Sequence, residues 1–240
     1  MGKKSVRKKN NGNTRLIGID SRHKQLKEIL PITPTQSEVF ERFADGDHLF
    51  LHGVAGTGKT FISLYLALEE IMHPDSTFRE IQIIRSVVPT RDVGFLPGSE
   101  KQKIEVFESP YKTIVNELFN NGTAYETLRK TNLINFNSTS FIRGRTFYDS
   151  IIIVDECQNM NFHELDSVIT RLGDNCLLMF CGDFRQSDFR ANDERNGIKN
   201  FMKIIKNMKQ FSFIEFTEAD IVRSSLVKSY IINKLELGIV

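Results

Sequence analysis

The octapeptide GVAGTGKT, from Gly53 to Thr60, limits the folds open to this 240-residue chain more than any other feature of its sequence. It matches the phosphate-loop pattern G-x-x-x-x-G-K-[ST], in which a loop connects a buried strand to a helix. Both neighbours are present, because the apolar run His48–Gly53 precedes the loop and a stretch with helical spacing, Lys59–Met72, follows it. A plain glycine-rich turn, the alternative interpretation, would need neither neighbour.

The residue types in this loop suit the binding of a nucleotide. Glycines let backbone N–H groups surround phosphate oxygens at a helix N-terminus, where the helix dipole favours negative charge. Lys59 is predicted to contact the β and γ phosphates, and the Thr60 hydroxyl is predicted to bind Mg2+. The predicted nucleotide-binding residues of the loop are Gly53, Val54, Ala55, Gly56, Thr57, Gly58, Lys59 and Thr60.

A pair of acids follows the aliphatic run in the stretch SIIIVDECQN, residues 150–159. Ligands of open α/β sheets bind beyond the carboxyl ends of the strands, which is where Asp155 and Glu156 would lie. Asp155 is predicted to hold the Mg2+ shell. Glu156 is predicted to orient or deprotonate an attacking water, which favours hydrolysis of the nucleotide over phosphorylation of a small molecule. A solvated turn is the alternative interpretation of this pair.

A third polar strand end occurs in FCGDFRQSD, residues 180–188. Asp183 and Gln186 follow an apolar run there, and Gln186 is predicted to contact the γ phosphate or the water and so to report hydrolysis. An ordinary polar exit from a strand into a loop would explain the same residues.

Short apolar runs alternate with amphipathic stretches from His48 onward, a pattern typical of an α/β fold with a mostly parallel central sheet and helices on both faces. The predicted strands are His48–Gly53, Glu80–Ser86, Ser150–Glu156, Cys176–Asp183 and Phe211–Phe216. The predicted helices are Pro34–Phe43, Lys59–Met72, Ser99–Phe119, Phe162–Leu172, Ile198–Met208 and Ala219–Leu237.

The N-terminal segment differs in composition from the rest of the chain. Six basic residues precede the first acidic residue, Asp20, although the net charge of the whole chain is only +2. We therefore expect residues 1–24 to form a basic, disordered tail and residues 25–240 to form one domain. The tail is either an arm that attracts nucleic acid or a solubilising extension.

The sequence contains no signal for a membrane, a disulfide framework or a metal cluster. No apolar run approaches the length needed to cross a bilayer, and the basic N-terminus lacks the apolar segment of a signal peptide, so a cytoplasmic location is expected. The three cysteines and five histidines lack the spacing of a disulfide framework or a zinc site. We expect the cysteines to be reduced thiols of the core.

Seven short motifs, together with the phosphate loop, make the chain similar to the PhoH-like protein family. The motifs occur in the order TPTQ, GFLPG, FIRGRTF, VDECQN, TRLG, GDFRQSD and DIVRSSLV, and the resemblance runs from about Pro34 to Tyr230. It implies a single RecA-like P-loop ATPase domain, related to the cores of superfamily 1 helicases. The short chain, with many Asn, Lys, Ile and Phe residues, would suit a phage member of this family, located in the host cytoplasm.

The resemblance implies a site for ATP and Mg2+ in which Gln36 contacts the adenine edge, because an amide can donate and accept hydrogen bonds together. It also implies that Gln186 senses the γ phosphate and that Arg223 is a candidate to deliver a positive charge to a neighbouring ATP, as an arginine finger does. The predicted catalytic residues are Lys59, Glu156, Gln186 and Arg223. An exposed helix residue and a surface ion pair are the alternatives for Gln36 and Arg223.

Two further arginines, Arg143 and Arg145 in FIRGRTF, are candidates for contact with nucleic-acid phosphates or with a neighbouring subunit. The chain departs from the usual form of the family at Ser224 and Ser225, where a histidine and a proline are typical, and in the loop SVVPTRDV, residues 86–93. These departures affect the expected contacts with substrate and neighbour more than the ATP site.

The function favoured by these features is Mg2+-dependent ATP hydrolysis coupled to single-stranded nucleic acid, with RNA favoured over DNA. One RecA-like core cannot form a two-core helicase cleft, so helicase-like action would need a homo-oligomer, for example a hexameric ring. The alternatives are a nucleotide-gated binding protein with little turnover and a P-loop kinase of small molecules. Glu156 argues against the kinase.

Overall fold

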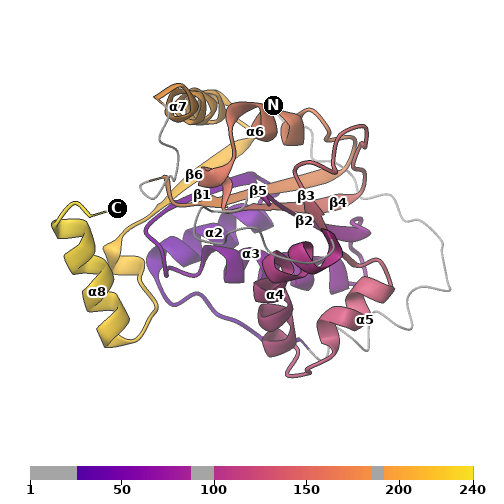
Figure 1. Ribbon diagram of the computed structural model, residues 1–240. Coiled ribbons are helices and arrows are strands. Elements are labelled where there is room, and N and C mark those ends of the chain that lie inside the picture. Colours follow the sequence, from indigo (N-terminus) through magenta and orange to yellow (C-terminus); the bar gives the residue numbers. More distant parts are fainter. Residues whose placement is uncertain (1–25, 88–99, 185–191, 240) are drawn as a thin grey trace.

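A six-stranded parallel sheet forms the centre of the molecule, with the strand order β3-β2-β4-β5-β1-β6 (Figure 1). A computed structural model describes residues 26–87, 100–184 and 192–239, apart from the side chains of residues 100–103 and 192–196. The strands are β1 (His48–Gly53), β2 (Glu80–Arg85), β3 (Ile134–Ser138), β4 (Ser150–Asp155), β5 (Cys176–Gly182) and β6 (Phe211–Phe216). The predicted tail and Gln186 lie outside the described residues.

Helices cover both faces of this sheet (Figure 1). The helices are α2 (Pro34–Ala44), α3 (Lys59–Met72), α4 (Glu100–Leu118), α5 (Ala124–Lys130), α6 (Phe162–Ile169), α7 (Asn192–Asn207) and α8 (Ser225–Glu236), with short 3-10 turns η1 (Cys157–Asn159) and η3 (Glu218–Asp220). Side chains from α2 to α5 share one apolar core with the sheet, and side chains from α6 and α7 share a second. The predicted RecA-like α/β fold is therefore confirmed.

The central strands are apolar on both faces because both faces are buried. Every residue of β4 is buried, and only the first residue of β5 is partly exposed. Such strands appear in a sequence as continuous apolar runs, and for this reason their positions could be predicted to within one residue.

The edge strand β3 was missed, and so was the short helix α5 before it. The sequence INFNS of β3 alternates apolar residues with asparagine instead of forming an apolar run. Asn135 and Asn137 donate hydrogen bonds to Glu80 and Gln82 of β2, which satisfies amides that look like loop residues in the sequence. An edge strand needs less apolar surface than a central strand, so its sequence signal is weaker.

The predicted ends of the last three helices were wrong by several residues. α6 ends at Ile169 and α7 begins at Asn192, whereas the predictions were Leu172 and Ile198. The last helix begins at Ser225 and not at Ala219, because η3 intervenes and Asp220 accepts a hydrogen bond from the backbone N–H of Thr217. None of the described helices has the length and apolar character needed to cross a membrane.

Candidate nucleotide-binding site

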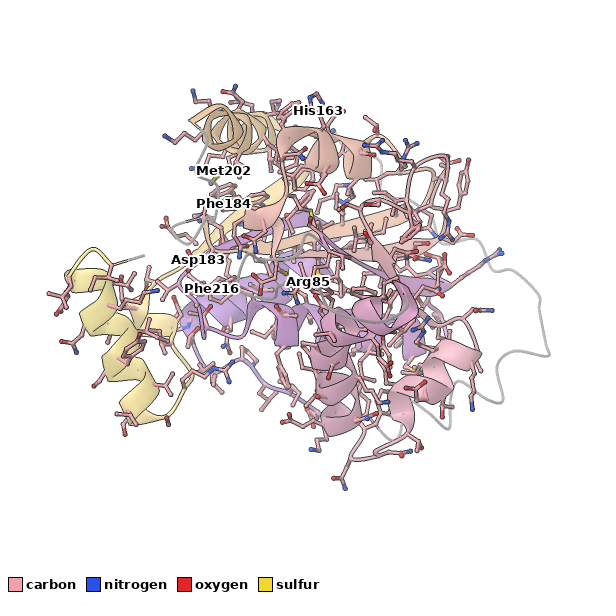
Figure 2. All side chains as sticks on the ribbon, viewed as in Figure 1. Arg85, His163, Asp183, Phe184, Met202 and Phe216 are labelled. Atoms are coloured by element: carbon pink, nitrogen blue, oxygen red, sulfur yellow. The ribbon has the colours of Figure 1, made fainter. Side chains whose placement is uncertain are left out.

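The strand order brings three polar strand ends together at one edge of the sheet. β5 lies between β1 and β4 and pairs with both of them. The phosphate loop follows β1, Asp155 ends β4 with Glu156 directly after it, and Asp183 follows β5. In Figure 2, Arg85, Asp183 and Phe216 lie between the layer of α6 and α7 and the layer of α3 and α4. All three residues are at the carboxyl ends of strands, so this edge is the candidate site.

The phosphate loop has a backbone that only glycine adopts easily. Gly53, Gly56 and Gly58 have φ angles of 121°, 77° and 87°, in the left-handed region that disfavours other residues. A Cβ atom at Gly53 would also overlap the backbone carbonyl of Phe216 at the end of β6. The glycines therefore allow the loop to turn tightly against β6 and to enter α3.

Lys59, the first residue of α3, points back along the loop. Its Nζ donates hydrogen bonds to the backbone carbonyls of Gly53 (2.9 Å) and Val54 (2.8 Å). Burial lowers the pKa of the Lys59 ammonium group, and the nearby carboxylate of Asp183 is the strongest influence that raises it. A cation in this position is well placed to meet the phosphates of a nucleotide.

Thr60 and Asp155 meet although 95 residues separate them in the chain. The hydroxyl of Thr60 donates to Oδ1 of Asp155 at 2.8 Å, and Asp155 is only 4% exposed. Burial and the neighbouring Glu156 raise the pKa of Asp155, whereas hydrogen bonds from Thr60 and Tyr111 lower it. A cation beside these residues would stabilise the charged carboxylate.

The donors at this point fit Mg2+, which prefers oxygen ligands and is commonly bound through one or two protein groups together with substrate phosphates. Thr60 and Asp155 would hold the ion, and bound Mg2+ would neutralise charge on the phosphates. Within residues 26–87, 100–184 and 192–239, no group of three or more His, Cys, Asp or Glu side chains forms a site for a metal.

Two residues that the sequence did not single out support Asp155. Tyr111 of α4 is fully buried and donates its hydroxyl to Oδ2 of Asp155 at 2.8 Å. Burial and Asp155 raise the pKa of Tyr111 well above its usual value, so the phenol remains a donor. Arg85, the last residue of β2, lies over the ring of Phe107. Burial acts to lower the pKa of Arg85, but Tyr111 and the two acids outweigh it and raise this pKa.

Glu156 occupies an unusual backbone conformation directly after β4. Its φ and ψ angles are 51° and 38°, in the left-handed region. Such a conformation in a residue other than glycine costs about 1 kcal/mol or more and is concentrated at functional sites. It turns the chain from β4 into η1 and places the Glu156 carboxylate within hydrogen-bond distance of Gln158.

Gln36 lies beside the phosphate loop, but its amide already has two partners. Its Oε1 accepts the N–H of Ile32 at 2.9 Å, and its Nε2 donates to the carbonyl of Thr57 at 3.3 Å. These bonds attach the segment before α2 to the loop. Each amide atom retains capacity for a second bond, so the predicted contact with adenine is chemically open and stays a prediction.

Arg223 lies against the phosphate loop of its own chain. A Cβ atom at Gly56 would be 3.0 Å from Cγ of Arg223 and 3.3 Å from Cδ1 of Ile231 in α8. The neighbouring Val222 donates its N–H to the carbonyl of Gly56. The catalytic role predicted for Arg223 stays a prediction.

Arg143 and Arg145 lie apart from the phosphate loop, on the segment between β3 and β4. Both are exposed, and Arg145 donates to Asn137 of β3 at 3.1 Å. The start of this segment is tied to α6, because the hydroxyl of Thr139 donates to Glu164 at 2.6 Å. The segment therefore begins beside the helix that follows the acid pair.

A family model described as PhoH-like protein matches residues 28–235. The PhoH-like protein of Synechocystis sp. is 31% identical over 193 residues, and protein PhoH of Escherichia coli is 28% identical over 217 residues. These alignments cover 80% and 90% of this chain but 58% and 60% of the two relatives. The chain therefore spans about 60% of the length of these curated relatives.

Solved structures with a similar arrangement include helicases. Unliganded Pif1 from Bacteroides sp. has a TM-score of 0.42 and 14% sequence identity, and the match covers 88% of this chain and 47% of that one. The Hef helicase domain of Pyrococcus furiosus has a TM-score of 0.41 and 13% identity, and the match covers 75% of this chain and 37% of that one. Both matches are to part of a larger chain.

Proposed function

The chain belongs to the PhoH-like protein family, and from this premise we propose that it binds ATP with Mg2+ and hydrolyses it. The observation that carries the proposal is the 2.8 Å hydrogen bond between Thr60 and Asp155. P-loop NTPases hold Mg2+ between a phosphate-loop hydroxyl and an aspartate at the end of a neighbouring strand. The same two residue types meet here at the N-terminus of α3.

The phosphate loop and the acid pair supply the central groups of this proposal. Lys59 binds the β and γ phosphates, and Thr60 and Asp155 hold the metal. Glu156 orients the attacking water and accepts its proton, which makes water the acceptor of the phosphoryl group. The roles of the remaining residues extend the proposal to γ-phosphate sensing by Gln186, adenine contact by Gln36 and charge stabilisation by Arg223.

The proposal includes coupling of this ATPase to single-stranded nucleic acid, with RNA favoured. Support comes from the exposed Arg143 and Arg145 on a segment whose first residues bind Glu164 of α6. α6 follows the acid pair in the chain, so a phosphate backbone held by these arginines would lie on an element connected to the site. Contacts of this kind are electrostatic and do not distinguish one nucleotide sequence from another.

The coupling is tested by steady-state ATP hydrolysis with Mg2+, in the presence and absence of single-stranded RNA and DNA. We expect RNA to raise the turnover, and we expect the double substitution of Arg143 and Arg145 by alanine to weaken RNA binding about tenfold or more and to reduce its salt dependence. Arg42→Ala, on an exposed arginine of α2 on the other face of the sheet, is the matched control. Equal affinity of the double variant, or a flat salt response, would contradict this placement.

The proposal also includes self-assembly, for which α8 is the supporting observation. None of the 12 residues of this helix is buried, and Leu226 and Tyr230 are 79% and 68% exposed. Isolated helices of about this length are marginal in water and need a packed face. In Figure 1, α8 lies at one side of the molecule, beyond β6. A second copy would cover this face close to Arg223.

Assembly is tested by light scattering of the chain with ATP, Mg2+ and RNA. We expect an oligomer, and we expect Leu226→Glu combined with Tyr230→Glu to shift it to monomer because two charges would replace buried apolar contacts. Val106→Glu, at an exposed apolar residue of α4, is the control. A wild-type chain that remains monomeric under all conditions would rule out the ring.

A further inference from the structure

Gln158, the central residue of η1, joins two polar strand ends of the site. Its Nε2 donates to Oε2 of Glu156 at 2.5 Å, and its Oε1 accepts the backbone N–H of Asp183 at 3.1 Å. Gln158 is only 5% exposed. A buried amide with both ends bonded holds its partners at a set separation, since each lost bond would leave a desolvated polar group.

The chemistry of the partners determines the orientation of this amide. Glu156 is a carboxylate and only accepts, whereas the N–H of Asp183 only donates. Rotating the Gln158 amide by 180° would place two donors together at Asp183 and two acceptors together at Glu156. A single amide orientation therefore satisfies both sides, and no carboxylate or alkyl side chain of this length could replace it.

Gly182 allows η1 to lie this close to β5. A Cβ atom at Gly182 would be 2.8 Å from Oε1 of Gln158 and 2.7 Å from Sγ of Cys157, both too short for carbon. The backbone of Gly182 is not in the left-handed region, so the reason for glycine here is space. The close contact between η1 and β5 thus depends on Gln158 of η1 and on Gly182 of β5.

We propose that Gln158 is a positioning residue for ATP hydrolysis, which holds the carboxylate of Glu156 against the backbone at the exit of β5. This inference rests on the proposed function, because it assigns Gln158 an effect through Glu156. The exit of β5 carries Asp183, whose charge acts on Lys59 of the phosphate loop. Gln158 therefore sets the distance between the water-activating acid and the strand end next to the phosphate-binding lysine.

The test uses the full chain with Gln158→Met, which keeps the length of the side chain and removes both hydrogen bonds. We expect kcat for ATP to fall about tenfold, while the dissociation constant for ATP stays within about twofold, because the residue acts on the water-activating group and not on the nucleotide. Gln82→Met is the matched control, since Gln82 is a fully buried glutamine in β2. It should lose stability without the same loss of kcat.

Gln158→Glu distinguishes the effects of the two hydrogen bonds made by Gln158. It retains an acceptor for the N–H of Asp183 but places a second carboxylate against Glu156. We expect it to reduce kcat at least as much as Gln158→Met. In the chain without nucleotide, amide hydrogen exchange at Asp183 should be at least about tenfold faster in Gln158→Met and close to wild type in Gln158→Glu. An unchanged exchange rate at Asp183 in Gln158→Met would show that Gln158 does not hold this N–H, and it would overturn the proposal.

A positioning role is distinguished from a structural one by combining Gln158→Met with Glu156→Gln. If Gln158 acts through Glu156, the double variant should hydrolyse ATP in a single turnover no more slowly than Glu156→Gln alone. Losses that multiply would overturn the proposal. Gly182→Ala disturbs the position of Glu156 in a second way, because the added Cβ would displace η1. We expect this variant also to lower kcat.

Failure of this inference differs from failure of the proposed function. If the wild type hydrolyses ATP and Gln158→Met hydrolyses it at the same rate, the positioning role alone is contradicted. A wild-type chain that binds ATP but never hydrolyses it would contradict the proposed ATPase, and the positioning role would fall with it.

Discussion

Glu156→Gln is expected to lower ATP turnover at least about 100-fold and to leave ATP binding nearly unchanged. A positioned general base contributes about 100-fold to 10,000-fold to the rate of a reaction, and glutamine cannot accept the proton of the attacking water. The substitution changes neither the size of the side chain nor the phosphate loop. Turnover is measured with saturating ATP and Mg2+, and binding is measured separately by calorimetry.

Glu80→Gln is the matched control for this experiment. Glu80 lies at the start of β2, at the opposite end of the strand from the site, where it accepts hydrogen bonds from Asn135 and Ser150. The same chemical change there should leave turnover within about twofold, since no catalytic group is removed. Full turnover in Glu156→Gln would contradict the assigned role, whereas normal ATP binding without turnover in the wild type would favour a nucleotide-gated binding protein.

Lys59→Ala is expected to weaken ATP binding about 10-fold to 100-fold. A hydrogen bond to a charged group contributes about 1.5 to 3 kcal/mol, which corresponds to this range of affinity. The loop itself should persist, because the glycine conformations and the hydrogen bond from Val54 to Phe216 do not involve the lysine side chain. Calorimetric titration with ATP and Mg2+ checks the affinity, and thermal unfolding checks the fold.

Lys206→Ala tests whether loss of any lysine would have the same effect. Lys206 belongs to α7, and its Nζ lies 4.2 Å from the ring centroid of Phe213, away from the phosphate loop. We expect this variant to bind ATP with wild-type affinity. Equal weakening in both variants would indicate a general effect of net charge on an anionic ligand and would contradict a direct contact by Lys59.

Part of the candidate site could be predicted because its residues carry a local signal. The phosphate loop is contiguous, and Asp155 and Glu156 directly follow an apolar strand. Tyr111 and Arg85 carry no such signal. Tyr111 looks like one more aromatic residue of an amphipathic helix, and it meets Asp155 only because α4 packs beside α3 on the same face of the sheet.

The sequence by itself determined the fold class, the central strands and the chemistry of the loop and the acid pair. These features depend on residues close together in the chain and on the burial of whole strands, which leaves continuous apolar runs. The tertiary structure alone decided which distant groups meet. β5 lies between β1 and β4, Thr60 reaches Asp155 across 95 residues, and Gln158 reaches Asp183 across 25. Strand order and the close approach allowed by Gly182 produce these contacts, and the sequence has no local pattern for either.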